Sequence, residues 1–270
     1  MTATSQHFTA APHLLIIFLF ASGALFAGEE LRLLSYNVRH GTAMDGSPAM
    51  DRQIAIMKRV NADVIGLQEI DQNCGRSGAV DQPAILAKGT ECSSHFGSFM
   101  DYNGGQYGMA MLSKLKVTES KVLRLPAGRE PRVAVILELL TAQKNRLLVA
   151  NVHFDWTDEA LRAPQAKALI ADLDTKDLPA VVLGDYNAKP GSPTLELFRQ
   201  AGFRFLDKPK NKRLTWNARE PSVEIDHVAI RSAASTTLHA EGIEVLDEPE
   251  ASDHRPVFAT LRIESKIGRE

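Results

Sequence analysis

Polar residues that could carry out chemistry follow an apolar run at several places in the chain. The clearest case is Gly184-Asp185-Tyr186-Asn187, which follows the apolar residues 180–183. This pattern predicts a buried strand with polar side chains at its carboxyl end. Because Asp185 and Asn187 are two residues apart, we expect them to point to the same side. They offer oxygen ligands, a water-orienting acceptor and an amide donor, although ordinary turn chemistry is the alternative interpretation.

Asn37, Glu69 and His153 also stand at or near the end of apolar runs. A carboxylate in such a place needs a partner, because burying an isolated charge is very costly. Glu69 is therefore either a ligand or an exposed loop residue. His153 is either a catalytic residue or a hydrogen-bonded structural histidine.

Two Asp-His pairs lie in the last fifth of the chain. Asp226-His227 falls within the expected strand 223–230, and Asp253-His254 precedes the last expected strand, 257–263. One such pair at a strand entrance could be only a turn. Two pairs fit a shared catalytic pocket better, since an aspartate that orients a histidine is a common acid-base arrangement.

The elements that must position these residues are strands and amphipathic helices. Apolar residues recur at helical spacing from Ala49 to Asn61 and from Asp158 to Leu173. The second of these helices leads directly into the Gly-Asp-Tyr-Asn strand and forms a β-α-β unit with the strand before it. Residues 71–100 read as a polar loop with a short helix from Pro83 to Lys88.

Length and composition indicate one globular unit. The chain has 270 residues, of which 44% are hydrophobic, and shows no break in composition. This is enough to bury one substantial core, so we expect residues 28–270 to form a single domain. The net charge of -2 lacks the strong basic bias of many duplex-binding proteins, although a nuclease needs only a local groove.

The first 27 residues resemble a signal peptide. An apolar stretch from Leu14 to Phe20 is followed by small residues up to Ala27. An uncleaved N-terminal anchor is the alternative, and either interpretation predicts an exported protein that is periplasmic, secreted or membrane-anchored. In such a protein Cys74 and Cys92 could form a disulfide, or they could be two unrelated thiols.

Seven short motifs follow one another along nearly the whole chain after the leader. They are Ser-Tyr-Asn-Val-Arg, Leu-Gln-Glu, Tyr-Gly-Met-Ala-Met-Leu-Ser-Lys, Asn-Val-His-Phe-Asp, Gly-Asp-Tyr-Asn, Ile-Asp-His-Val and Ser-Asp-His-Arg-Pro-Val. In this order they resemble the endonuclease/exonuclease/phosphatase (DNase I-like) superfamily. The resemblance implies a four-layer αββα sandwich, in which two packed mixed β-sheets are flanked by helices. It also implies hydrolysis of a phosphate ester by water with a divalent metal, usually Mg²⁺, with Mn²⁺ as a substitute.

The resemblance assigns the metal and the attacking water to four residues. Glu69 would be the principal metal ligand, with Asn37 beside it. Asp253 would complete the metal and water network, and Asp185 would orient or deprotonate the water. Mg²⁺ prefers oxygen ligands and keeps much of its own water, so few protein ligands suffice.

The resemblance gives four further residues roles around the phosphate and the leaving group. Asn187 would bind the phosphate, while His254, oriented by Asp226, would stabilise the phosphoryl oxygens. His153 matches the histidine that supports the leaving-group side in several branches. Arg132, just before the expected strand 133–140, is either close to this site or a surface arginine.

The sequence therefore predicts an exported, metal-dependent phosphodiesterase or phosphatase. The substrate would be a lipid headgroup, a small phosphodiester or a nucleic acid, and a secreted DNase I-like endonuclease is the close alternative. A catalytically silent binding module is a third reading, which the complete set of site residues disfavours. No obligate protein partner is evident, and we expect a monomer.

Overall fold

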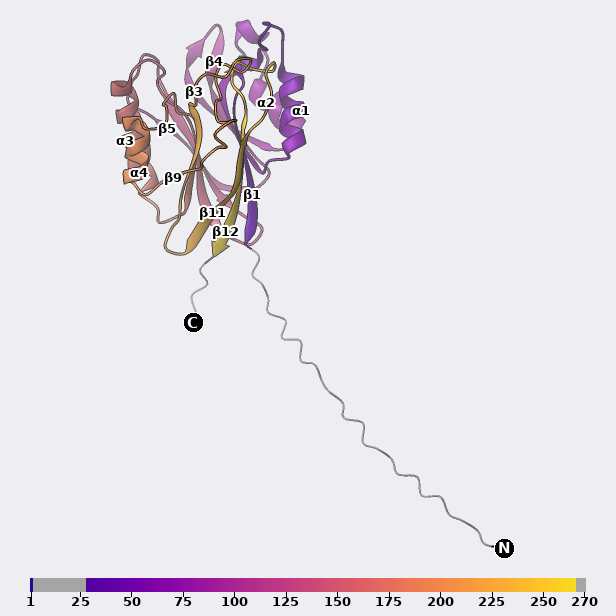
Figure 1. The fold of residues 1–270 in the computed structure, drawn as a ribbon. Helices are drawn as coiled ribbons and strands as arrows, with labels where there is room; N and C mark the ends of the chain where they lie inside the picture. Colours follow the sequence, from indigo (N-terminus) through magenta and orange to yellow (C-terminus); the bar gives the residue numbers. More distant parts are fainter. Residues whose placement is uncertain (2–27, 266–270) are drawn as a thin grey trace.

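Two six-stranded β-sheets pack face to face, and two helices cover the outer face of each (Figure 1). The computed structural model describes Met1 and residues 28–265. The four layers are those of the αββα sandwich that the resemblance implied.

Both sheets are mixed. The first has the strand order β11 (Thr236–Val245), β12 (Val257–Ser265), β1 (Glu29–Asn37), β2 (Val64–Gln72), β4 (Gly105–Ser113) and β3 (Ser93–Tyr102). The second has the order β5 (Lys116–Arg124), β6 (Val133–Leu140), β7 (Arg146–His153), β8 (Ala180–Asp185), β10 (Asp226–Arg231) and β9 (Arg204–Phe205). The helices are α1 (Met50–Val60) and α2 (Gln82–Thr90) on the first sheet, and α3 (Glu159–Leu173) and α4 (Pro193–Gln200) on the second.

The face of each sheet that points into the sandwich changes from apolar to polar along its strands. The apolar members in three central strands are Leu31 and Leu33 of β1, Leu147 and Val149 of β7, and Val181 and Leu183 of β8. Because side chains alternate along a strand, the residues that continue these faces are Asn37, His153 and Asp185. One end of the layer between the sheets therefore gathers the groups that the sequence singles out.

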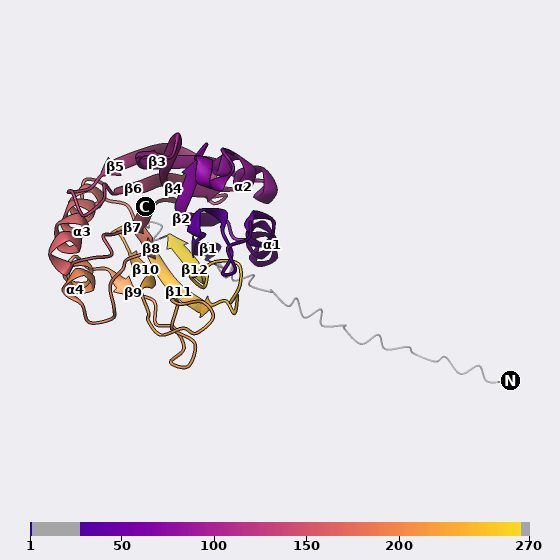
Figure 2. The ribbon, with the colours of Figure 1, turned by 90° about the horizontal axis from the view of Figure 1, so that it is seen from above.

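Strand direction explains why these groups meet. β1 runs parallel to β2, and β7 runs parallel to β8. The carboxyl ends of the two strands in each pair therefore lie side by side. Figure 2 views the sandwich end-on. Glu29 pairs with Ile263 at the start of β1, so both ends of the described chain lie away from the polar end of that strand.

A buried amide pair joins the two sheets below the polar end. The Asn151 amide nitrogen donates to the carbonyl oxygens of Leu67 and Ala110, both at 3.0 Å. Its oxygen accepts from the Gln68 amide at 2.6 Å. Asn151 is fully buried, so these bonds satisfy both ends of an amide that would be costly to leave unpaired.

The expected helices 49–61 and 158–173 are confirmed as α1 and α3, with the Asp158 side chain capping α3 through the backbone nitrogen of Ala160. The polar loop expected over residues 71–100 is partly wrong. Its short helix is α2, but β3 begins at Ser93. This strand lies at the edge of its sheet and is only half-buried, so its outer positions carry polar residues.

The two cysteines are both free thiols, so a disulfide between them is not formed. Cys74 is buried beneath the β3–β4 connection, and its Sγ lies 3.1 Å from the carbonyl oxygen of Tyr102 at the end of β3. Cys92 directly precedes the first residue of that strand. A ten-residue strand spans roughly 33 Å, which keeps the two thiols apart.

The expected leader, residues 1–27, lies outside the described residues apart from Met1. In the part of the chain that is described, no helix is long and apolar enough to cross a membrane. The extent of the single domain, residues 28–270, stays a prediction.

Candidate active site

A β-bulge places Glu69. The pairing of β2 with β4 steps from Gln68 opposite Met109 to Ile70 opposite Gly108, which leaves Glu69 without a partner. Its φ angle of 57° is rare for a residue with a side chain. Bulges are frequent beside active sites because they redirect a side chain. The strand therefore does not end at Glu69, as the sequence indicated, but continues to Gln72.

Gly184 gives the Gly-Asp-Tyr-Asn motif its shape. Its φ is 144°, and a Cβ atom there would lie 2.1 Å from the carbonyl oxygen of Val152, so only glycine fits. Asp185 Oδ1 accepts the backbone N–H of Asn187 at 2.9 Å, which is the turn interaction considered as the alternative. The Asn187 amide donates to the carbonyl oxygen of Phe154 at 3.1 Å. The motif is therefore both a turn and a wall of the site.

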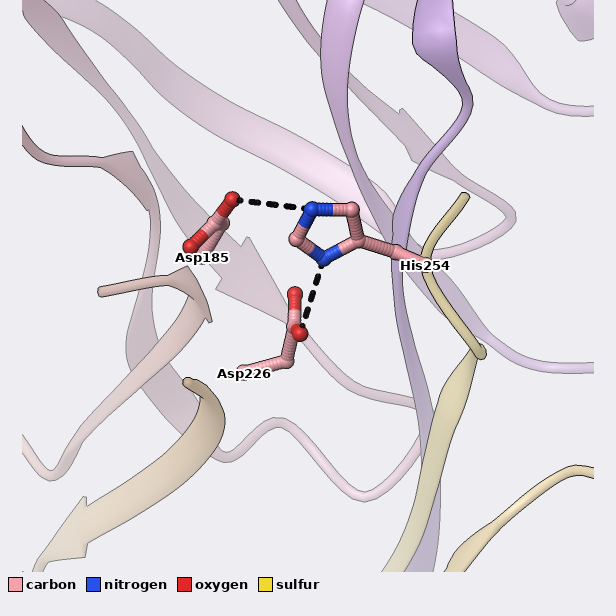
Figure 3. Close-up of side chains that lie close together, drawn as sticks. All are labelled: Asp185, Asp226 and His254. Atoms are coloured by element: carbon pink, nitrogen blue, oxygen red, sulfur yellow. Dashed lines mark hydrogen bonds and ion pairs between the residues drawn. The ribbon is translucent and has the colours of Figure 1, made fainter. Parts of the chain in front are cut away.

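His254 lies between two carboxylates (Figure 3). Its Nδ1 is 3.0 Å from Asp226 Oδ2, and its Nε2 is 3.7 Å from Asp185 Oδ2. All three residues are buried. Asp226 and Asp185 are paired residues on the neighbouring strands β10 and β8. The register of this pairing therefore sets the positions of the two carboxylates that flank the imidazole.

Three side-chain nitrogen atoms lie near Asp185 Oδ2. The Asn37 amide donates a hydrogen bond to it at 3.3 Å, while His153 Nε2 at 3.5 Å and His254 Nε2 at 3.7 Å lie within ion-pair distance. Asn37 also donates to Glu69 Oε1 at 3.0 Å. Asn37 therefore links the two carboxylates that the resemblance assigns to the metal and to the water.

Burial and neighbouring charges set the protonation of these groups. Burial, together with the charge of Asp226, raises the pKa of Asp185. Burial alone would lower the pKa of His254, but the charges of Asp226 and Asp185 outweigh it and raise that pKa. At neutral pH His254 is therefore an imidazolium, with both N–H groups directed at carboxylates.

Glu69 and His153 carry the opposite balance. Burial would raise the pKa of Glu69, but the side chains of His40, His153 and Asn37 together hold it well below its usual range. Burial and the nearby Arg132 guanidinium lower the pKa of His153 well below its ordinary value. Glu69 is thus a carboxylate and His153 a neutral imidazole that can donate from Nε2 to Asp185.

These side chains line one pocket with a volume of about 470 Å³. Six predicted site residues are among its lining: Glu69, His153, Asp185, Asn187, Asp253 and His254. Asn37 and Asp226 lie directly behind them through the contacts above. The structure thus brings all eight predicted residues together, while their individual roles stay predictions.

The donor set fits a hard divalent cation. Glu69, with its low pKa, and Asp253 offer carboxylate oxygens on the pocket wall, and Mg²⁺ needs only one or two of these. Ligand atoms of Asp185, Asp226 and His254 also lie within 4.8 Å of one another. That cluster is a poorer metal site, because a protonated imidazole has no free lone pair.

Several neighbours of the site carry no recognisable motif in the sequence. His40 Nδ1 is 3.8 Å from Glu69 Oε2. The Thr215 hydroxyl accepts the backbone N–H of Asp226 at 3.3 Å, and the Ser252 hydroxyl donates to the carbonyl oxygen of Asn37 at 2.7 Å. Arg132, for which the sequence left two readings, is 2% exposed and lines the pocket, so it is not a surface arginine.

The sequence profile of the endonuclease/exonuclease/phosphatase family matches residues 34–254. This range contains every predicted site residue. A search of the curated proteins gives no match.

Solved structures share the fold over most of the chain. An endonuclease/exonuclease/phosphatase from Bacteroides vulgatus is 20% identical, with a TM-score of 0.73 over 87% of this chain and 100% of that one. The mannosyl-6-phosphatase Bt3783 of Bacteroides thetaiotaomicron VPI-5482 is 16% identical, with a TM-score of 0.70 over 87% and 99%. ANGEL2, a 2′,3′-cyclic phosphatase, is 15% identical, with a TM-score of 0.70 over 87% and 95%. At these identities the likeness concerns the fold.

Proposed function

The chain belongs to the endonuclease/exonuclease/phosphatase family, whose members hydrolyse phosphate esters, and we propose that it is a divalent-metal-dependent phosphodiesterase or phosphatase. The observation that carries the proposal is the chain of Asp226, His254 and Asp185, in one pocket with Glu69. The names of two similar structures, a mannosyl-6-phosphatase and a 2′,3′-cyclic phosphatase, support a phosphate ester as substrate.

His254 stabilises the phosphoryl group. Held by Asp226 at Nδ1, its protonated ring presents Nε2–H to the pocket. A charged donor aimed at an oxygen that gains negative charge stabilises the transition state of phosphoryl transfer. Asn187 has a second amide N–H besides the one that binds Phe154, and this group holds another phosphoryl oxygen.

Asp185 orients the attacking water and accepts its proton. Burial and Asp226 raise its pKa, which brings the carboxylate closer to the basicity that a general base needs near neutral pH. Asn37 and His153 hold Oδ2 in place. In this structure His153 therefore contacts the base directly, in addition to the leaving-group role that the resemblance implied.

Asn37, Glu69 and Asp253 would hold the Mg²⁺ or Mn²⁺. When bound, the cation neutralises charge on the phosphoryl oxygens as the ester bond breaks. The pocket combines the carboxylates of Glu69, Asp185 and Asp253 with the cationic Arg132 and His254, and a bound cation would offset the negative charge of those carboxylates beside a phosphate. This balance favours a metal-dependent reaction.

A secreted endonuclease is the second candidate within the same chemistry. The formal net charge of -2 gives it no general electrostatic support, because duplex binding relies on basic surfaces. The signal-like segment 1–27 supports export, and N-terminal sequencing of the protein from its native compartment would test it. A monomer without an obligate protein partner remains our expectation.

The proposal is tested by assaying the purified protein on a panel of phosphate esters. The panel holds chromogenic phosphate mono- and diesters, an inositol phosphate, a sugar phosphate, sphingomyelin, and plasmid and single-stranded DNA. We expect one class to be cleaved with Mg²⁺ or Mn²⁺ and no cleavage with EDTA. Cleavage that EDTA leaves unchanged would contradict the metal requirement, and a folded, metal-supplied protein that cleaves nothing would favour a binding module.

A further inference from the structure

Both tryptophans of the chain line the active-site pocket, and both are exposed. Trp156 is 57% exposed and Trp216 is 40% exposed, whereas Asp185 and His254 in the same pocket are at most 5% exposed. Isolated apolar residues on a surface are common. Two exposed indoles on one catalytic pocket instead give it a buried polar floor and an aromatic rim.

Trp216 belongs to an apolar wall joined to the catalytic histidine. Its backbone nitrogen donates to Val223 O at 3.1 Å and its carbonyl accepts from Val223 N at 2.8 Å. It also forms a β-bridge with His254. Val223 and Ile225, two residues apart, line the pocket beside the indole, so the wall and the catalytic residue are held by the same backbone pairing.

The buried Asp155, which directly precedes Trp156, ties the backbone around this tryptophan to a second segment of the chain. The Asp155 carboxylate accepts the backbone N–H of Thr157 at 2.8 Å and that of Arg129 at 2.6 Å. The Arg129 guanidinium lies 5.9 Å from the centre of the Trp156 ring, within reach of a cation-π contact. The loop that carries this indole is therefore ordered before a ligand arrives, which lowers the entropy cost of binding.

Arg132 shows where the phosphate of a ligand goes. Its side chain is 2% exposed, and its Nε and Nη1 atoms have no hydrogen-bond partner within the described residues. Only Nη2 is paired, 3.2 Å from Glu130. A buried guanidinium with free donors in the same pocket as His254 favours an anion at the floor, so the remainder of an ester leads outward past the two indoles.

We infer that the substrate is a small phosphate ester whose alcohol part is a ring that stacks on Trp156 and Trp216. The inference rests on the proposed function and narrows its substrate class. Indoles bind the flat faces of sugars and bases, and a volume of about 470 Å³ suits a small molecule. The other exposed large apolar side chains in residues 28–265, Ile85, Tyr102 and Val122, do not line the pocket, which disfavours a membrane-binding patch around it.

Tryptophan fluorescence reports on this pocket alone, because both tryptophans of the chain line it. It therefore measures binding and does not require turnover. The Asp185→Asn variant, with Mg²⁺ present, would be titrated with a hexose 6-phosphate, a nucleoside 5′-monophosphate and glycerol 3-phosphate. These ligands carry the same phosphomonoester, and only the first two carry a ring. We expect at least one ring ligand to bind roughly tenfold more tightly than glycerol 3-phosphate, a size typical of one stacking contact.

Matched variants assign that preference to the indoles. Trp156→Ala and Trp216→Ala, each added to Asp185→Asn, should reduce the preference to less than about threefold, while Trp→Phe should keep most of it. Binding in these variants would be followed by calorimetry. Ile85→Ala, on the same background, removes an exposed apolar residue outside the pocket and should leave the preference unchanged.

Equal binding of ring and glycerol phosphates, or binding of none of them, would overturn the inference. So would binding to phosphatidylcholine vesicles that both Trp→Ala changes abolish, because the rim would then be a membrane contact. If the wild-type protein hydrolyses no ester but the preference for ring ligands persists, the proposed function is wrong and the inference about the ring stands. Hydrolysis of ring and glycerol phosphates with equal efficiency would keep the function and overturn the inference.

Discussion

Nδ1 of His254 lies 3.0 Å from Oδ2 of Asp226, although the two residues are 28 positions apart in the chain. The contact forms because Asp226 begins β10, opposite Asp185 at the end of β8. The β-bridge from His254 to Trp216 brings the histidine to the same place. The charge of Asp226 keeps the imidazole protonated, and its position leaves Nε2 facing the pocket.

Replacing Asp226 by Asn should therefore impair catalysis without unfolding the protein. The amide keeps the shape of the side chain but removes the charge that raises the pKa of His254. We expect kcat to fall about 100-fold, as for loss of a general acid-base partner. Steady-state kinetics measure this, and circular dichroism checks the fold. A kcat within about twofold of the wild-type value would show that the pair is not catalytic.

Glu69→Gln should weaken metal binding while preserving the contact with Asn37. The amide oxygen can still accept that hydrogen bond, but the negative charge is lost. Removing even an indirect metal partner costs about 10 to 100-fold in affinity, so we expect at least a tenfold rise in the Mg²⁺ concentration for half-maximal activity. An unchanged Mg²⁺ requirement would place the metal elsewhere.

The sequence predicted the strand-end residues because the signal is local. Asp185 and Asn187 follow an apolar run directly, and two Asp-His pairs are visible without any fold. Of these pairs, His227 does not line the pocket, because its Nε2 lies 2.9 Å from the carbonyl oxygen of Ala188 and its ring packs against Tyr186. The bulge at Glu69 has no such signal, because residues 63–69 look like a short buried strand that ends at Glu69. Its geometry depends on β4, to which β2 pairs.

Other features depended on contacts between segments far apart in the chain. Thr215 and Ser252 reach Asp226 and Asn37 only through the folded loops. The edge strand β3 is only half-buried, and its polar residues resemble a loop. The position of Trp156 and Trp216 on one pocket could not be inferred either, because 60 positions separate 156 from 216 in the chain.

Asn151→Ala should destabilise the protein as a whole. The change removes the bonds to Leu67, Ala110 and Gln68 and leaves buried polar groups without partners. Each such group costs roughly 1–3 kcal/mol, so we expect a loss of about 3 kcal/mol in the free energy of unfolding. Urea denaturation measures it, with the exposed Gln200→Ala as a control. A loss below about 1 kcal/mol would show that the layer between the sheets relaxes or admits water.

Glu138 should make stability depend on pH. Its carboxylate lies 2.7 Å from Lys176 Nζ and 2.8 Å from Arg146 Nη2. The hydrogen bond from Lys176 is the main cause that lowers its pKa from 4.5 to about 2. A lowered folded-state pKa adds stability above the ordinary value, and this contribution is lost as the pH falls from 4.5 towards 2.

We therefore expect Glu138→Gln to be less stable than the wild type by about 1 kcal/mol at pH 7, since its partners are partly exposed. The difference should vanish near pH 2. The control is Glu241→Gln, which breaks an exposed ion pair between Glu241 and Arg262. Both of these residues lie in the first sheet, away from Glu138 in the second, and we expect little effect of pH on the difference. A difference that stays constant between pH 7 and pH 2.5 would contradict the assignment.

The central claim is that this pocket hydrolyses phosphate esters, and one comparison of histidine variants tests it most directly. His254→Ala would be assayed with Mg²⁺ beside His239→Ala, which removes an imidazole from β11 whose partner is the exposed Glu264. The account predicts a loss of about 100-fold or more in kcat/KM for His254→Ala and wild-type activity for His239→Ala, with both proteins folded. Equal activity of the two variants would contradict it.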